Sequence, residues 1–193
     1  FIGNGVSELI DLSLRALDLT LEISRRTVDS RTQSVDLVQA RLDGGVAGIL
    51  EIAERFAKIG KPKRSVLFAA VTLEESGLLG SKYYVAHPVV PLDKTVAVIN
   101  LDALAPVGKA RDITVVGQGS SELESVLETV LDSQQRKAVG ETNTAAGYYF
   151  RSDHFNFAKA GVPALYVDSG TDLLEGGQAA GDAAGKDYTD NRY

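Results

Sequence analysis

Residues 65–81 read SVLFAAVTLEESGLLGS, and this stretch decides the fold. The apolar, partly β-branched run over 65–72 is typical of a strand that is buried on both faces of a sheet. Glu74 and Glu75 follow it, and a short helix is expected over 77–84. A buried strand that leads through acids into a helix predicts an α/β protein with its site beyond the strand end.

Three more strands are expected further along the chain. TVAVINLDAL contains a second central strand over 95–101, with Asp102 directly after it. A shorter strand over 113–116 is expected nearer an edge of the sheet, and the last strand over 164–167.

Helical spacing of apolar residues separates these strands. Helices are predicted over 6–21, 46–59, 122–133 and 152–160. A short strand is expected over 35–38, and the Gly- and Ala-rich segment 176–185 is expected to be a loop. The pattern predicts one α/β domain over 1–193, a three-layer sandwich with a central mixed, mostly parallel sheet flanked by helices. Residues 1–40 would supply an N-terminal helix and strand, and 46–193 the core.

Composition excludes several classes of function. The 193 residues carry a net charge of −6, which argues against a nucleic-acid partner. The chain has no Cys, so disulfides, thiolate zinc sites and Cys nucleophiles are excluded together. No apolar stretch reaches the roughly 18 residues of a membrane span, so no membrane partner is expected. The start, FIGNGVSELIDLSL, has no basic n-region, so no signal peptide is visible, and the opening Phe in place of Met favours a processed or cut chain.

Glu74 and Glu75 are the first candidates for chemistry. Adjacent residues at a strand end point in different directions, so one carboxylate can bind a metal while the other reaches a metal-bound water. That division suits metal-assisted hydrolysis, in which a carboxylate takes the proton of the water. The alternative is a helix N-terminus, where acids favour the helix dipole.

Asp102 is the next candidate, since Asp is depleted from strands and this one ends a strand. Ligands bind beyond the carboxyl ends of strands in open α/β sheets, but Asp102 could also cap the following loop. The consecutive Ser152, Asp153 and His154 cannot form a catalytic triad, whose members converge from separate elements. Ser152 is expected to cap the helix, while Asp153 and His154 support a site.

The remaining motifs carry little chemistry. The chain has two histidines, and His87 precedes a proline in VAHPVVPL, so a surface position is expected for it. Gly117 and Gly119 lack the third glycine of a dinucleotide-binding loop and predict a turn.

In their order and spacing, several segments resemble the co-catalytic zinc exopeptidases, the family of bacterial leucyl aminopeptidases and glutamate carboxypeptidase. The resemblance runs from about Val46 to the C-terminus and is strongest to bacterial members with an inserted protease-associated domain. The segments that carry it are GVAGILEIAERFA, KPKRSVLFAAVTLEESGLLGSKYYV, PLDKTVAVINLDAL, YFRSDHFNFAKAGVPALYVDSGTD and KDYTDNRY.

The resemblance implies a mixed sheet between helices, two zinc ions and hydrolysis of peptide N-termini. Glu74 matches the general base, Glu75 a ligand of one zinc and Asp102 a ligand of the other. Tyr149 matches the position that steadies the oxyanion in some members. Ser152, Asp153 and His154 match the motif that supports the site. The resemblance also favours a secreted or periplasmic location.

Some expected zinc ligands have no match in the sequence. The family supplies one His from a His-x-Asp strand end, and no His-x-Asp precedes the matching segments here. The acid that bridges the two metals falls where this chain reads QARLDGG, so Asp43 is the candidate bridge if the loop is shortened. The last family ligand is a His shortly after the segment that matches KDYTDNRY. Carboxylates without imidazole suit Ca²⁺ or Mg²⁺ better than zinc, so weak zinc binding is expected. An inactive remnant or a binding module that retains the fold is therefore the alternative function.

Overall fold

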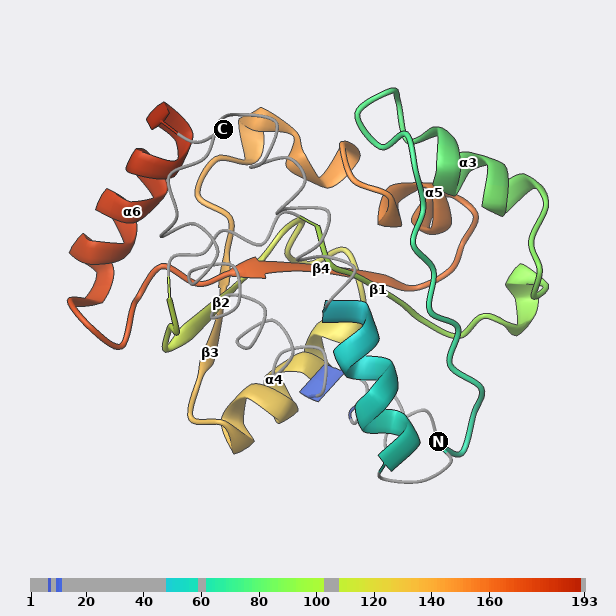
Figure 1. The fold of residues 1–193 in the computed structure, drawn as a ribbon, viewed down its shortest axis with the longest axis horizontal. Coiled ribbons are helices and arrows are strands. Elements are labelled where there is room, and N and C mark those ends of the chain that lie inside the picture. Colours follow the sequence, from blue (N-terminus) through green and yellow to red (C-terminus); the bar gives the residue numbers. More distant parts are fainter. Residues whose placement is uncertain (1–6, 8–9, 12–47, 59–61, 103–107, 192–193) are drawn as a thin grey trace.

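The computed structural model describes residues 7, 10–11, 48–58, 62–102 and 108–191. Within them, a four-stranded mixed sheet has the order β1-β4-β2-β3 (Figure 1). The strands are β1 (Val98–Asn100), β2 (Asp112–Val115), β3 (Lys137–Gly140) and β4 (Ala164–Ser169). β1 pairs with β4 and β2 with β3 in parallel, while β2 and β4 are antiparallel. The α/β sandwich with a mixed sheet is thereby confirmed.

The main core lies between this sheet and the helix α4 (Leu123–Ser133). Ile113 and Val115 of β2 alternate with residues on the other face and are 0% and 2% exposed. Leu127 and Leu131 stand one helical turn apart on the buried side of α4 and meet them. The period of about 3.6 residues that predicted this helix is therefore the period of its core contacts.

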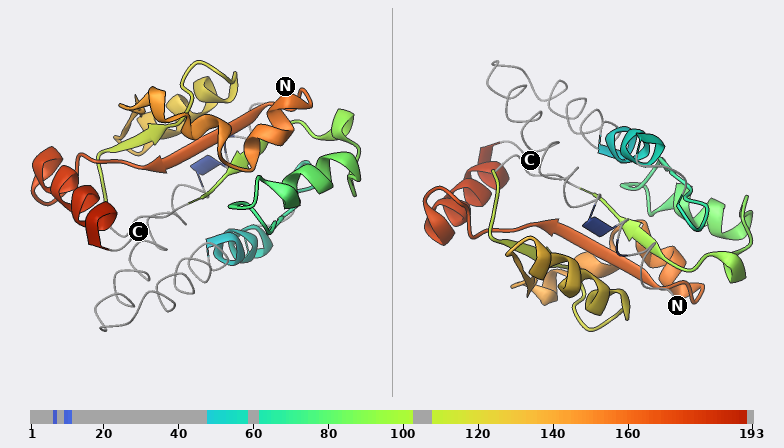
Figure 2. Two further views of the ribbon diagram at one scale, coloured as in Figure 1. Left: turned by 90° about the horizontal axis from the view of Figure 1, so that it is seen from above. Right: turned by 90° about the horizontal axis from the view of Figure 1, so that it is seen from below.

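A second, smaller core lies on the opposite side of the sheet, where Figure 2 shows the helix over 48–58 facing away from α4. Ile52 and Phe56 are buried there and pack against Val66 and Leu101. The prediction of a helix over 46–59 is confirmed for its described residues. Leu101 contacts both cores, so the end of β1 joins the two layers.

Two short helices lie beside β1 and β4. They are α3 (Leu79–Ala86) and α5 (His154–Lys159); α5 packs against β1 and β4, and α3 packs against α5. Single 3-10 turns lie at η1 (Leu92–Lys94), η2 (Thr144–Ala146) and η3 (Tyr148–Phe150). The helix α6 (Gly177–Asn191) lies at the far end of the sheet (Figure 1).

The buried strand predicted over 65–72 is wrong. Those residues run extended beside the helix over 48–58, but they form no strand, and Leu67 and Phe68 are 55% and 37% exposed. An apolar sequence has a high tendency to form a strand, but a strand also needs a neighbouring backbone to bond with. Among the described residues, no backbone bonds connect this segment to β1. Phe68 instead packs against Phe56, with ring centroids 6.3 Å apart.

Two expectations about strand positions also change. The strand over 113–116 was expected near an edge, but β2 lies between β4 and β3. The strand over 95–101 was expected to be central, but β1 ends the order of described strands. β3 was not predicted, because Lys137 and Gly140 have low strand propensity.

The Gly- and Ala-rich segment expected as a loop is the helix α6. Ala is the strongest helix former, and Gly181 is a packing requirement, because a Cβ there would lie 1.9 Å from the carbonyl oxygen of Thr171. The strand over 35–38 lies outside the described residues, and the helix over 6–21 is described only at 7 and 10–11, which are helical. None of the described helices is long and apolar enough to span a membrane.

Candidate functional site

Acidic residues gather at the carboxyl ends of β1 and β4. Asp102 lies two residues after β1 ends, and Asp168 is the penultimate residue of β4. Because the two strands are parallel, both acids come to the same edge of the sheet. Burial raises the pKa of Asp168 to about 6, and the charge of Asp102 adds to the effect, whereas the backbone N–H of Ser169 opposes it.

Tyr166 belongs to β4 and lies opposite Asn100 in the register of β1 and β4. Burial raises the pKa of Tyr166 above its usual range, and the nearby Asp102, Asp168 and Glu74 raise it further. Its phenol therefore stays protonated.

Ser152 connects β1 to the segment that begins α5. Its Oγ donates a hydrogen bond to Asp102 Oδ2 at 2.5 Å and accepts one from Asn100 Nδ2 at 2.7 Å. The expected helix cap at Ser152 is wrong, since the N-cap residue is Asp153 and no side chain caps it. The buried serine instead donates a charge-assisted hydrogen bond to Asp102 and accepts one from Asn100.

Asp153 has a serine of its own on the neighbouring helix. Ser81 Oγ of α3 donates to Asp153 Oδ1 at 2.5 Å and accepts from Asn156 Nδ2 at 2.9 Å. Burial raises the pKa of Asp153, with the hydrogen bond from Ser81 opposing and the charge of Asp102 adding.

Glu74 is half-buried in the turn between the 65–72 segment and α3, facing these aspartates. Burial is the largest cause that raises its pKa to about 7. The charges of Asp102, Glu75 and Asp153 raise the pKa further, and Arg151 opposes them. Glu75 itself is exposed, so the two adjacent carboxylates have different surroundings.

Tyr149 and His154 form an aromatic group beside the acids. The Tyr149 ring lies against Gly117, where a Cβ would come within 2.1 Å of it. His154 is 0% exposed, and its ring contacts Tyr149 at 4.8 Å and Tyr166 at 4.9 Å between centroids. Neither ring nitrogen of His154 has a hydrogen-bond partner among the described residues, and burial lowers its pKa to about 4. His154 is therefore neutral at pH 7.

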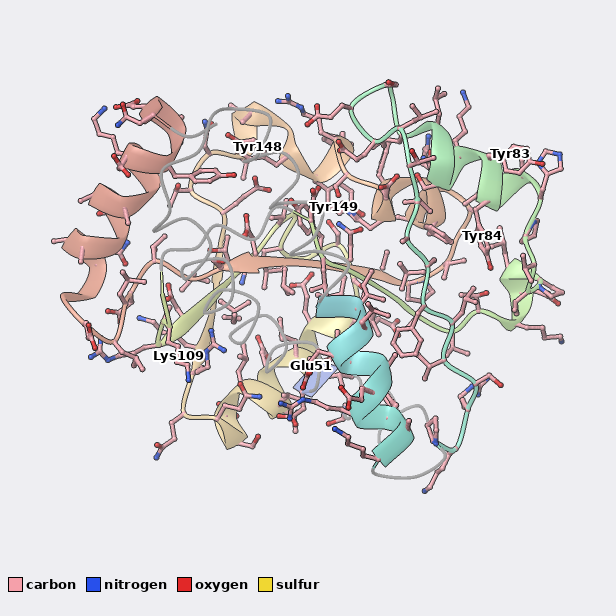
Figure 3. The ribbon with its side chains drawn as sticks, viewed as in Figure 1. Glu51, Tyr83, Tyr84, Lys109, Tyr148 and Tyr149 are labelled. Carbon is pink, nitrogen blue, oxygen red and sulfur yellow. The ribbon has the colours of Figure 1, made fainter. Side chains whose placement is uncertain are left out.

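The other histidine lies apart from the acids. His87 ends α3, is exposed and stacks on Tyr83 at 4.4 Å, as a surface position predicted. Figure 3 shows Tyr83 of α3 at the periphery and Tyr149 near the middle of the molecule.

A zinc site needs about four N, S or O donors. Within the described parts of the chain, no three His, Asp or Glu side chains are arranged to hold a metal ion. Glu75 and Asp102 offer carboxylates only, and the imidazole of His154 faces aromatic rings. Asp43, the expected bridging ligand, and the connection over 40–46 lie outside the described residues. The described residues thus do not fit a zinc pair by themselves.

The structure brings together Glu74, Asp102, Asp153 and Ser152, with Glu75 beside Glu74. Sequence reasoning missed further residues of this group, namely Ser81, Asn100, Asn156, Tyr166 and Asp168. Period-two spacing along a strand offered a signal for those on β1 and β4, since Asn100 precedes Asp102 by two positions and Tyr166 precedes Asp168 by two.

Comparison with known proteins adds independent information. The sequence model of one protein family, described as peptidase family M28, matches residues 43–193. A protein named probable lipoprotein aminopeptidase LpqL, from Mycobacterium tuberculosis, is 29% identical over 151 residues, 70% of this chain and 29% of its own length. Leucine aminopeptidase 2 of Arthroderma otae is 29% identical over 179 residues, 85% of this chain and 35% of its own length. The chain thus spans about a third of the length of these relatives. No solved structure matches it.

Proposed function

Because the chain belongs to peptidase family M28, we propose that it carries the acidic half of an aminopeptidase-type site, with Glu74 as the general base. The observation that carries the proposal is the half-buried position of Glu74 beside Asp102, Glu75 and Asp153, where burial first and then these charges raise its pKa to about 7. A general base works best when its pKa is near the operating pH, so that it is partly free to accept a proton and able to return it. A glutamate of ordinary pKa would be a weaker base.

The acids also select the substrate. The α-ammonium group of a peptide N-terminus is a cation, and the carboxylates beside Glu74 would attract it. Arg151 is the cation that acts on Glu74, and its single charge does not balance the cluster. Peptides with a free N-terminus are thus the proposed substrates. The net charge of −6 argues against a nucleic-acid partner.

Zinc is the cofactor that the family membership suggests, and when bound it would activate water and polarise the scissile carbonyl. Glu75 and Asp102 are proposed ligands, Asp43 a proposed bridge and Tyr149 a group that steadies the oxyanion. His154 lies buried among aromatic rings and His87 on the outer surface, so neither imidazole is available to these carboxylates. We therefore propose that the 193-residue chain binds zinc weakly and hydrolyses peptides slowly.

The second candidate is a peptide-binding module without turnover. It is favoured by the same observation, that the acids are assembled but no imidazole joins them among the described residues. Such a module would bind peptide amines through the carboxylates and release them unchanged.

A location outside the cytoplasm is proposed as well. It is supported by the family resemblance and by the name of the mycobacterial relative, which calls that protein a lipoprotein.

Two assays on the full chain test these proposals. The first follows hydrolysis of leucyl-nitroanilide with added zinc, using Glu74→Gln as the control. Little turnover is expected, and what remains should be lost in the control. The second measures binding of a leucyl peptide against its N-acetylated form, and only the free amine should bind. Absence of both turnover and amine binding would sink the proposed function, and binding alone would favour the module.

A further inference from the structure

The strand relay consists of Asn100, Ser152 and Asp102, and its direction follows from donor chemistry. Asp102 is a carboxylate that accepts only, so the hydroxyl proton of Ser152 goes to it. Ser152 Oγ then has lone pairs alone to offer to Asn100, whose Nδ2 must donate at 2.7 Å. Ser152 is 2% exposed, so water does not compete for these bonds.

The helix relay consists of Asn156, Ser81 and Asp153, and it has the same order of residue types. Ser81 Oγ lies 2.5 Å from Asp153 Oδ1 and 3.2 Å from the Leu78 carbonyl oxygen, so its single proton goes to the carboxylate. Asn156 Nδ2 reaches both Ser81 Oγ and the Leu78 oxygen. A carbonyl oxygen only accepts, and this fixes which end of the Asn156 amide faces it.

We propose that the strand relay and the helix relay hold Asp102 and Asp153 in single conformations beside Glu74. On this proposal Asn100, Asn156 and Ser81 are positioning residues of the acidic site. The inference deepens the proposed function and rests on it for its catalytic meaning.

The physical need for such relays comes from the charges themselves. Carboxylates that share a small space repel, and a free aspartate would rotate toward water. A hydrogen bond of 2.5 Å from a hydroxyl to a carboxylate is in the short, charge-assisted range that resists this rotation. Each asparagine in turn restrains the serine hydroxyl, because the asparagine Nδ2 donates to a lone pair of the serine Oγ and so opposes its rotation.

The two relays anchor on different elements. The strand relay ties β1 to Ser152, two residues before α5, while the helix relay ties α3 to α5. A buried serine is the central member of each relay: Ser152, 2% exposed, in the strand relay and Ser81, 0% exposed, in the helix relay. Damage to one relay should therefore free its own aspartate and leave the other in place.

The test measures side-chain conformation and does not depend on turnover. In the full chain with labelled aspartates, three-bond NMR couplings report the χ1 rotamers of Asp102 and Asp153. Ser81→Ala and Asn156→Leu should change the Asp153 couplings from those of one staggered rotamer to a rotamer average and leave Asp102 unchanged. Asn100→Leu should do the reverse.

Ser133→Ala is the matched control, since Ser133 Oγ donates to the Val130 carbonyl at the end of α4. It should change neither aspartate. Two variants in the helix relay keep the test decisive if one of them fails to fold. The proposal is overturned if Asp153 keeps one rotamer in a folded helix-relay variant, or if both aspartates loosen together. Couplings that change as expected in a chain without turnover or amine binding would uphold the relays and reject the proposed function.

Discussion

Replacement of His154 by phenylalanine should remove a pH dependence of stability that the aromatic surroundings create. Burial between Tyr149 and Tyr166 lowers the pKa of His154 to about 4, from 6.5 in the unfolded chain. Between these values the unfolded chain binds a proton that the folded protein does not, so stability is lost as the pH falls from 6.5 toward 4. Each pKa unit corresponds to about 1.4 kcal/mol, so the shift contributes about 3 kcal/mol of lost stability at pH 4.

The assay is urea unfolding of the wild type and of His154→Phe at about pH 7 and about pH 4, with the difference between the proteins as the quantity of interest. This difference cancels the carboxylates, whose raised pKa values act in the opposite direction. The free energy of unfolding of the wild type relative to the variant should fall by about 3 kcal/mol between the two pH values. A difference that does not change with pH would show that His154 is accessible to protons in the folded state and would refute the burial argument.

Three further predictions concern other parts of the chain. Without metal, the free energy of unfolding of the wild type relative to Glu74→Gln should fall as the pH rises from 4.5 through about 7, because the fold disfavours ionised Glu74, and urea unfolding of both proteins measures this difference. Gly181→Ala should lower the melting temperature, because its Cβ would lie 1.9 Å from the Thr171 oxygen, whereas Gly185→Ala, in open space, should stabilise by about 1 kcal/mol. Leu67→Ser should change the free energy of unfolding by less than about 0.5 kcal/mol, since the side chain is 55% exposed, and a loss of several kcal/mol in urea would restore the buried-strand prediction.

Much of the fold could be predicted from local patterns. The apolar spacing of α4 is the same spacing that its core contacts require, so 122–133 predicted Leu123–Ser133 closely. Gly161 and Pro163 lie between α5 and β4. A glycine followed by a proline is typical of a helix C-terminus, so the end of α5 and the start of β4 could be predicted. The position of Asp102 at a strand end likewise followed from a single apolar run and one acid.

The failures share a cause, namely that pairing and packing are tertiary properties. The run over 65–72 has the composition of a strand, but composition does not supply the neighbouring backbone that a strand bonds to. In α6 the glycines suggested a loop, although Gly181 is required by the close approach of Thr171. Composition alone does not distinguish a glycine that permits flexibility from one that permits contact.

The candidate site divides in the same way. Glu74, Glu75 and Asp102 stand next to apolar runs and were predicted from the sequence, whereas Asp168, which belongs to β4, was missed. Ser81 and Asn156 belong to helices 75 positions apart in the chain, and their hydrogen bond exists only because α3 packs on α5. No local pattern distinguishes such a serine from the others in the chain.

The central claim is that this 193-residue chain assembles the carboxylates of a peptidase site without imidazoles to hold zinc beside them. Equilibrium dialysis against buffered zinc, followed by metal analysis, tests it most directly. We expect weak binding that never reaches two ions per chain and that becomes weaker still in Glu75→Ala or Asp102→Ala. Tight binding of two zinc ions that both variants abolish would contradict it, because these carboxylates would then belong to a complete metal centre.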